Sequence, residues 1–97
     1  MNVISRRGLV ALEKQHPEAV PALERWYRTA RKATWLDLNE VRRVYPSADQ
    51  VGNVLIFDVS GGNYRLITVP IYRKQRLYIK ALLRHREYDR GRWLKWA

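Results

Sequence analysis

The stretch that decides the fold is residues 53–84, NVLIFDVSGGNYRLITVPIYRKQRLYIKALLR. From residue 53 onward the apolar pattern has a period of two, which is typical of strands. Residues 60–63 (SGGN) are a hairpin-turn signal, and residues 74–75 (KQ) mark a second, less regular turn. Pro70 lacks an amide hydrogen, so we expect it at a sheet edge or beside a bulge. These breaks predict three antiparallel strands, at residues 53–59, 64–73 and 76–84.

The sequence before this stretch has helical spacing instead. Ser5 is a plausible N-cap for a first helix, and Pro17 both ends that helix and starts a second one. Asp37 opens a third helix, in which Glu40 completes an acidic capping box. The predicted helices therefore occupy residues 5–15, a segment from residue 17 to about residue 32, and a short segment from residue 37 that ends before residue 46.

The remaining segments complete an α+β architecture. Residues 85–96 are expected to form a short helix broken at Gly91, and residues 2–4 either a short strand or an anchored terminus. We interpret Trp26 and Trp35 as core residues. Helices followed by a meander predict an α+β fold, with N-terminal helices packed on one face of a small, mainly antiparallel sheet. Residues 1–97 are expected to form a single domain.

The charge of the chain indicates an anionic partner. Nineteen Lys and Arg against nine Asp and Glu give a formal net charge of +10 and a pI near 10.5. Residues 51–97 contain ten basic and three acidic side chains, against nine and six in residues 1–50. Such an excess attracts phosphate-rich polymers, so a nucleic acid is the expected partner. Solubility and an anionic membrane surface are the alternatives.

Several classes of function are excluded by what the sequence lacks. There is no cysteine, hence neither a disulfide nor a thiolate metal site. No apolar run approaches the roughly 18 residues of a membrane span, and no signal peptide is evident, so we expect a cytoplasmic protein without a membrane partner. Motifs for phosphate loops, zinc proteases and nucleophile elbows are also missing. Carboxylates in the second half are too few and too scattered for a two-metal nuclease, so we expect no cofactor and no metal.

Pairing arithmetic brings charged side chains together in the predicted sheet. If residues 60 and 63 flank the first turn, Arg65 faces Asp58. If residues 73 and 76 flank the second turn, the pairs are Arg65 with Arg84, Val69 with Lys80, and Ile71 with Tyr78. Facing arginines repel one another, and a bound phosphate would reverse the sign of that interaction. Alternatively, Arg65 simply pairs with Asp58 while Arg84 points into water, or a one-residue slip changes the partners.

His85 follows the third predicted strand directly. In one helical turn His85, Tyr88 and Asp89 would share a side, because they are spaced three and four residues apart. An imidazole, a phenol and a carboxylate beside arginines suit acid–base chemistry on a phosphodiester. A lone histidine after a strand also fits a surface or capping residue. His16 is interpreted as a helix-end residue without a functional role.

Two stretches resemble motifs of a known family. Residues 60–66 (SGGNYRL) and 84–89 (RHREYD) are similar to the Gly-Asn-Lys-Tyr-Arg-Leu and Thr-His-x-Glu-Tyr-Asp motifs of the HigB family of bacterial toxins. This family lies within the RelE-like group of mRNA endonucleases. The helix around Trp26, residues 33–35 (ATW) and residues 45–48 (YPSA) also look like family landmarks. The resemblance therefore extends over about residues 2–90.

The resemblance implies a function and a set of residues. It implies a toxin that inhibits translation by cleaving mRNA on the ribosome, through attack of a ribose 2′-hydroxyl on the adjacent phosphate. A helix-turn-helix antitoxin of the HigA type would neutralise it. His85 and Tyr88 would transfer protons, Arg65 and Arg84 would stabilise charge on the phosphate, and Asp89 would orient His85 or cap the terminal helix. RNA would be held by Tyr64, Arg73, Lys74, Arg76, Tyr78 and Lys80.

The motifs depart from the family pattern at the turn and at its end. Gly62 and Asn63 occupy the motif's Asn and Lys positions, so a cation is missing at the turn, and Arg84 stands where the family usually has Thr. A toxin-like fold that has lost activity would fit this loss. A non-catalytic RNA- or DNA-binding module on the same basic sheet would fit the charge equally well, but it gives no reason for His85 and Tyr88 to lie together.

Overall fold

A computed structural model describes all residues, 1–97, and contains both helices and strands. In chain order the elements are β1 (Asn2–Ile4), α1 (Arg6–Gln15), the 3₁₀ helix η1 (Pro17–Ala19), α2 (Val20–Lys32), α3 (Leu38–Val44), β2 (Asp49–Val51), β3 (Val54–Val59), β4 (Tyr64–Ile71), the 3₁₀ helix η2 (Tyr72–Lys74), β5 (Arg76–Arg84), α4 (His85–Asp89) and the 3₁₀ helix η3 (Arg92–Trp96). None of the helices is long and apolar enough to cross a membrane.

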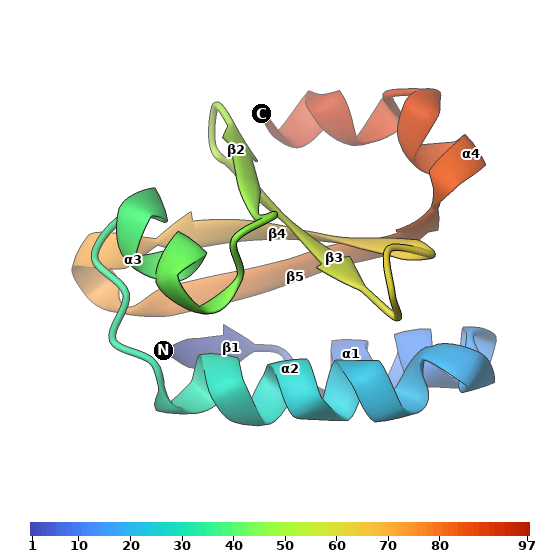
Figure 1. Ribbon diagram of the computed structural model, residues 1–97, viewed down its shortest axis with the longest axis horizontal. Coiled ribbons are helices and arrows are strands. Elements are labelled where there is room, and N and C mark those ends of the chain that lie inside the picture. Colours follow the sequence, from blue (N-terminus) through green and yellow to red (C-terminus); the bar gives the residue numbers. More distant parts are fainter.

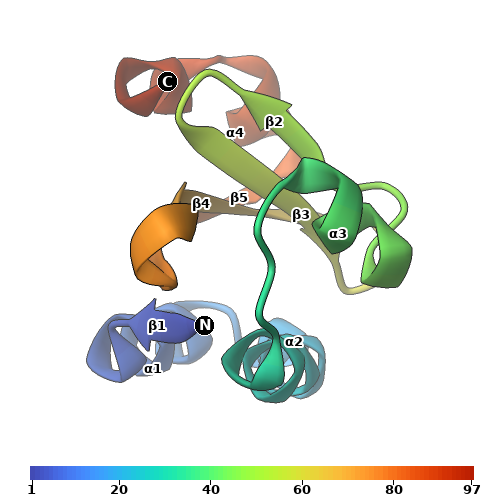
Figure 2. The same ribbon diagram turned by 90° about the vertical axis from the view of Figure 1, so that its left-hand side faces the viewer.

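The five strands form one sheet in the order β1-β5-β4-β3-β2. β1 runs parallel to β5, and the other neighbours are antiparallel. Helices α1 and α2 lie side by side under one face, whereas α4 and η3 lie over the opposite face (Figures 1 and 2). The predicted α+β class and the N-terminal helical layer are confirmed. Strand β2 and the cover on the second face were not predicted.

Local capping explains where the helices begin. The Ser5 hydroxyl accepts a hydrogen bond from the Gly8 amide at 2.9 Å, and the Asp37 carboxylate accepts one from the Glu40 amide at 3.0 Å. The Glu40 carboxylate in turn accepts from the Leu36 amide at 2.6 Å. Both predicted N-caps are therefore confirmed, and each satisfies amides that a helix leaves without partners.

Both faces of the sheet are buried, by two separate cores. The larger core joins α1, α2 and α3 to the sheet, and in it Trp26 packs against Phe57 with ring centroids 5.4 Å apart. Trp35 packs on the same ring at 6.0 Å, so both tryptophans are core residues as predicted. The smaller core is formed on the opposite face by Val54, Ile56, Ile67 and Trp93.

The first hairpin has the predicted register, but the second does not. Asp58 pairs with Arg65 as expected. β4 then ends at Ile71, and η2 together with Gln75 makes a four-residue connection instead of two, with Gln75 in the left-handed region at φ 54°. Lys80 is an extra residue in β5, because Ile67 pairs with Ala81 whereas Thr68 pairs with Ile79; the bulge lies there.

Because of these two irregularities, all three pairings predicted across the second hairpin are wrong. The observed pairs are Tyr64 with Arg84, Arg65 with Leu83, Val69 with Tyr78, and Ile71 with Arg76. Successive side chains of a strand point to opposite faces, so a one-residue shift puts Arg65 and Arg84 on opposite faces of the sheet. The predicted phosphate site between facing arginines is therefore wrong.

A small charged cluster joins α1 to α2. The Arg6 guanidinium donates to both carboxylate oxygens of Glu24, at 2.8 and 3.0 Å. Glu13 lies beside them with only 11% of its side chain exposed, and its carboxylate is 3.9 Å from Arg6. Burial, helped by a hydrogen bond with Glu24, raises the pKa of the Glu13 carboxyl from 4.5 to about 7. The hydrogen bond from Arg6 lowers the pKa of Glu24.

Candidate functional site

The segment after β5 has the helical turn that the sequence predicted. The Glu87 carboxylate accepts a hydrogen bond from the Arg84 amide at 3.2 Å, and this contact starts α4. The turn ends at Arg90, and Gly91 at φ 72° directs the chain into η3. The predicted break at Gly91 is confirmed, because only a residue at ease with a positive φ fits there without strain.

An open cleft of about 540 Å³ lies at this end of β5, beside the first hairpin turn. Its walls come from η1, the turn between β3 and β4, and the junction of β5 with α4. Three of the predicted site residues line it together: Tyr64, Arg84 and His85. Sequence reasoning missed the other four lining residues, which are Glu18, Ser60, Asn63 and Arg86.

Glu18 is the acidic side chain of the cleft. Its carboxylate lies 3.3 Å from the Arg84 guanidinium and accepts a hydrogen bond from the Tyr64 hydroxyl. The Arg84 guanidinium in turn lies 5.8 Å from the centre of the Tyr64 ring. Tyr64 is only 4% exposed, so its ring has little surface on which a base could stack. Glu18 is thus paired with the Arg84 guanidinium, the cation that an RNA phosphate would contact.

His85 and Asp89 form the pair that their spacing predicts. The imidazole Nε2 lies 3.4 Å from a carboxylate oxygen of Asp89, and both side chains are well exposed, at 68% and 60%. A carboxylate at this distance can orient the imidazole.

Arg65 and Tyr88 lie on the other face of the sheet. The Arg65 guanidinium is 3.0 Å from the Asp58 carboxylate and donates to the Gly62 carbonyl at 2.7 Å. It also lies 5.6 Å from the ring of Tyr88, which stacks on Trp93 at 5.0 Å. Burial raises the pKa of the Tyr88 hydroxyl, and nearby Asp49 adds to the rise, so this phenol stays protonated at neutral pH. The four predicted catalytic side chains are therefore divided between two surfaces.

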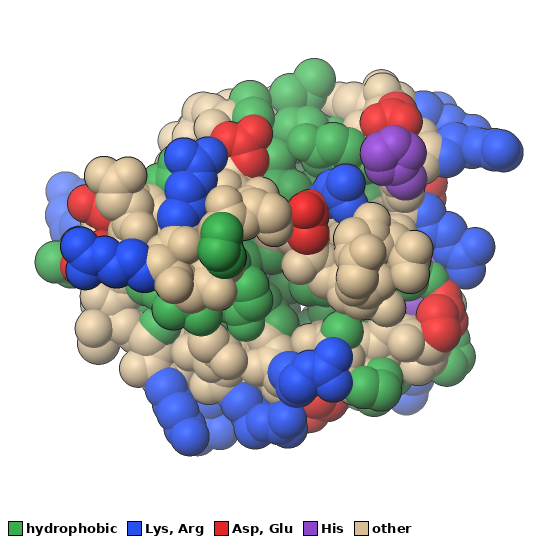
Figure 3. All heavy atoms as spheres, viewed as in Figure 1, with side chains coloured by type: hydrophobic (Ala, Val, Ile, Leu, Met, Phe, Trp, Pro, Cys, Tyr) green, Lys and Arg blue, Asp and Glu red, His purple; other side chains and the backbone are tan.

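Three of the predicted RNA-binding cations lie at the opposite end of β5, and the fourth, Lys80, lies midway along the strand. Arg73 and Lys74 belong to η2, Arg76 begins the strand, and Lys80 occupies the bulge with its ammonium 5.9 Å from the Tyr78 ring. At about 3.3 Å per residue, β5 places Arg76 roughly 25 Å from Arg84. Lys and Arg side chains also fringe the molecule at the α4 end and along α2 (Figure 3). A ligand reaching both ends of β5 must therefore be an extended polyanion.

A mixed sheet over two N-terminal helices, with a basic cleft where its longest strand ends, defines the RelE-like class of α+β proteins. The family model of the HigB toxins, described as the RelE-like toxic component of a toxin-antitoxin system, matches residues 19–91. The chain belongs to this family, as the motifs at residues 60–66 and 84–89 predicted. Membership implies an antitoxin as a partner.

Curated relatives align over almost the entire chain. The mRNA interferase HigB of Escherichia coli O6:H1 (strain CFT073) is 26% identical over 93 residues, which is 93% of this chain and 90% of that protein. The mRNA interferase toxin HigB of Escherichia coli K12 is 24% identical over 92 residues, covering 92% and 88%. The mRNA interferase HigB of Shigella flexneri is similar to the same extent.

Proposed function

We propose that this protein is an endoribonuclease toxin that inhibits translation in the cytoplasm by cleaving mRNA on the ribosome. Its chemical step uses no metal and no cofactor, and a helix-turn-helix antitoxin of the HigA type neutralises it. The observation that carries the proposal is the cleft in which Arg84 and His85 meet, in a chain of net charge +10. The relatives are named mRNA interferases, which supports the same activity.

The reaction is a transfer within the RNA chain. The ribose 2′-oxygen attacks the adjacent phosphorus, the bond to the 5′-oxygen breaks, and the products are a 2′,3′-cyclic phosphate and a 5′-hydroxyl. One base must take the 2′-hydroxyl proton, and one acid must give a proton to the leaving oxygen. His85, oriented by Asp89, is the proposed base, and Arg84 neutralises the charge that develops on the phosphate.

Tyr88 is the proposed acid, and Arg65 is a further proposed donor to the phosphate. A phenol with a raised pKa holds its proton, so Tyr88 suits the acid and not the base. Neither Tyr88 nor Arg65 lines the cleft, so both would act only on RNA that passes over α4. The basic residues at the far end of β5 would hold mRNA or ribosomal RNA backbone.

Substrate binding must open one ion pair. Glu18 and Arg84 are 52% and 63% exposed, and an exposed pair contributes at most about 1 kcal/mol, which a phosphate held in two places by the same guanidinium can outweigh. Glu18 therefore competes with RNA without blocking it.

The experiment compares His85→Ala and Arg84→Ala with the wild type in mRNA cleavage, with and without ribosomes. We expect losses of about 10²–10⁴ for His85→Ala and 10²–10³ for Arg84→Ala, as for a proton-transfer group and a donor to developing charge. Melting temperatures should fall by at most a few degrees, because both side chains are mostly exposed and their ion pairs are weak. Arg7→Ala, another exposed arginine, is the matched control. If both cleft variants cleave at the wild-type rate, the proposal fails.

A further inference from the structure

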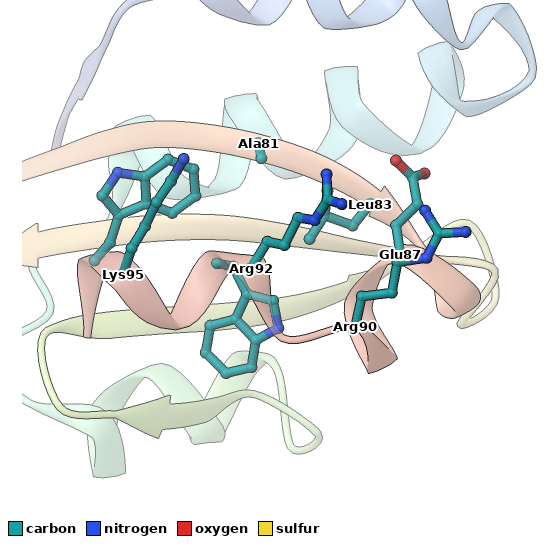
Figure 4. Close-up of a pocket in the computed structure, with 8 residues that line it drawn as sticks. Ala81, Leu83, Glu87, Arg90, Arg92 and Lys95 are labelled. Atoms are coloured by element: carbon teal, nitrogen blue, oxygen red, sulfur yellow. The ribbon is translucent and has the colours of Figure 1, made fainter.

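A second, smaller pocket lies between β5 and the C-terminal segment, on the face opposite α1 and α2. Its apolar lining consists of Ala81 and Leu83 from β5 and Trp93 and Trp96 from η3 (Figure 4). Its volume is about 120 Å³. This is well below the roughly 300–1,000 Å³ of pockets that enclose drug-sized ligands. The pocket therefore has room for one flat ring and little more.

The rim of this pocket is basic. Arg90, Arg92 and Lys95 line it, are exposed, and make no ion pair or side-chain hydrogen bond. Residues 90–97 contain no acidic side chain. Glu87 is the one carboxylate on the rim, and it already accepts a hydrogen bond from the Arg84 amide at 3.2 Å. The pocket thus favours a ligand that joins a flat ring to negative charge.

The two tryptophans have different roles. Trp93 is 6% exposed, stacks on Tyr88, and donates its indole hydrogen to the Tyr88 carbonyl at 2.9 Å, so it belongs to the smaller core. Trp96 is only half-buried, and its indole nitrogen donates to no group of the protein. The Lys95 ammonium lies 4.8 Å from the Trp96 ring. An accessible indole with a free donor and a cation beside it can stack on a base and bond its edge.

We propose that this pocket binds one base of a single-stranded RNA, stacked on Trp96, with neighbouring phosphates on Arg90, Arg92 and Lys95. The pocket uses residues of β5 that lie between the bulge at Lys80 and the cleft at Arg84, but on the opposite face of the sheet from that cleft. A single RNA strand that occupies both sites must therefore pass around the edge of β5. Stacking combined with cations along the backbone is how proteins hold single strands. The inference rests on the proposed function, to which it adds a base-binding subsite outside the cleavage cleft.

The test measures binding of a short 2′-O-methyl RNA, which lacks the attacking hydroxyl and cannot be cleaved. Trp96→Ala should weaken binding about 5- to 100-fold, the range for losing one base stack, whereas Trp96→Phe should retain most of the affinity. Leu94→Ala is the matched control, since Leu94 is 51% exposed on the same segment but does not line the pocket. Duplex RNA, whose bases are not free to enter, should bind both Trp96 variants like the wild type.

Photocrosslinking to a 4-thiouridine RNA gives a second measurement. It uses the wild-type protein, so it does not depend on whether a variant folds. The crosslinked peptide should include residues 92–97. A folded Trp96→Ala protein with wild-type affinity overturns the inference, as does an equal loss for duplex RNA or a crosslink that maps elsewhere.

The two proposals fail separately in this design. If the protein binds the uncleavable RNA through Trp96 but cleaves no mRNA, the pocket stands and the endonuclease proposal falls. If it cleaves mRNA but Trp96→Ala leaves binding unchanged, only the pocket falls.

Discussion

Replacing Arg65 with alanine should destabilise the protein, because three partners hold this side chain. It is 18% exposed and contacts the Asp58 carboxylate at 3.0 Å, the Gly62 carbonyl at 2.7 Å and the Tyr88 ring at 5.6 Å. These contacts join the first hairpin to α4. A site serving only a phosphate would leave the guanidinium with fewer protein partners.

The size of the effect follows from the contacts. A hydrogen bond from a charged donor contributes about 1.5–3 kcal/mol, reduced here by partial exposure, and the stacked ring adds about 0.5–1 kcal/mol. The Asp58 pair, with its carboxylate 32% exposed, adds at most about 1 kcal/mol. These terms overlap, so we expect Arg65→Ala to lose about 2–3 kcal/mol. For a domain of this size that lowers Tm by about 10–20 °C.

Asp58→Ala is the matched comparison. It removes the ion pair but leaves the Gly62 and Tyr88 contacts of Arg65, so the loss should be at most about 1 kcal/mol, or a few degrees. Arg65→Ala cannot gain stability from relief of repulsion, because Arg84 lies on the other face of the sheet.

The assay is thermal melting of both variants together with their rates of mRNA cleavage. A catalytic Arg65 would lose cleavage by about 10²–10³ at a temperature where the variant is still folded. An Arg65→Ala protein that melts within about 2 °C of the wild type would refute the structural reasoning. One that melts early yet cleaves at the full rate when folded would refute the catalytic role.

Two further predictions concern charge. RNA affinity should fall about 50- to 130-fold between roughly 50 and 200 mM salt if four or five phosphates are contacted, and an affinity that does not change with salt would contradict phosphate-driven binding. Folded Glu13 keeps its proton up to about pH 7, whereas the unfolded chain releases it near 4.5, so its stabilisation is complete below pH 4.5 and lost as the pH rises through 7. Glu13→Gln should therefore raise Tm by a few degrees near pH 8 and hardly at all near pH 4, and equal shifts at both would disprove the raised pKa.

Elements with a local chemical signature could be predicted from the sequence. The caps at Ser5 and Asp37 each fix a helix start through one side-chain hydrogen bond, and the glycines of residues 60–63 accept the positive φ angles of the first turn. The second turn could not be predicted, because Gln75 adopts a left-handed conformation that its residue type does not favour. The apolar run at residues 54–57, VLIF, did contain a signal for burial on both faces of β3.

The same division applies to the site. The contact of His85 with Asp89 follows from a four-residue spacing within one helical turn, so the sequence could predict it. Glu18 contacts Arg84 across 66 residues of chain, and only the packing of η1 against the end of the sheet brings them together. The predicted pairing of Arg65 with Arg84 is wrong because the turn and the bulge each change the register, and neither is marked by a pattern in the sequence.

Because of the bulge at Lys80, β5 can contain one additional residue without a change in the direction of the side chains beyond it. One additional residue in a regular strand would rotate everything beyond it to the other face, but a bulge absorbs that residue and leaves Arg84 facing the cleft. The number of residues between the second turn and the His85 motif can therefore drift during evolution while the cleft persists. The spacing between motifs alone is therefore not sufficient to assign site residues on this strand.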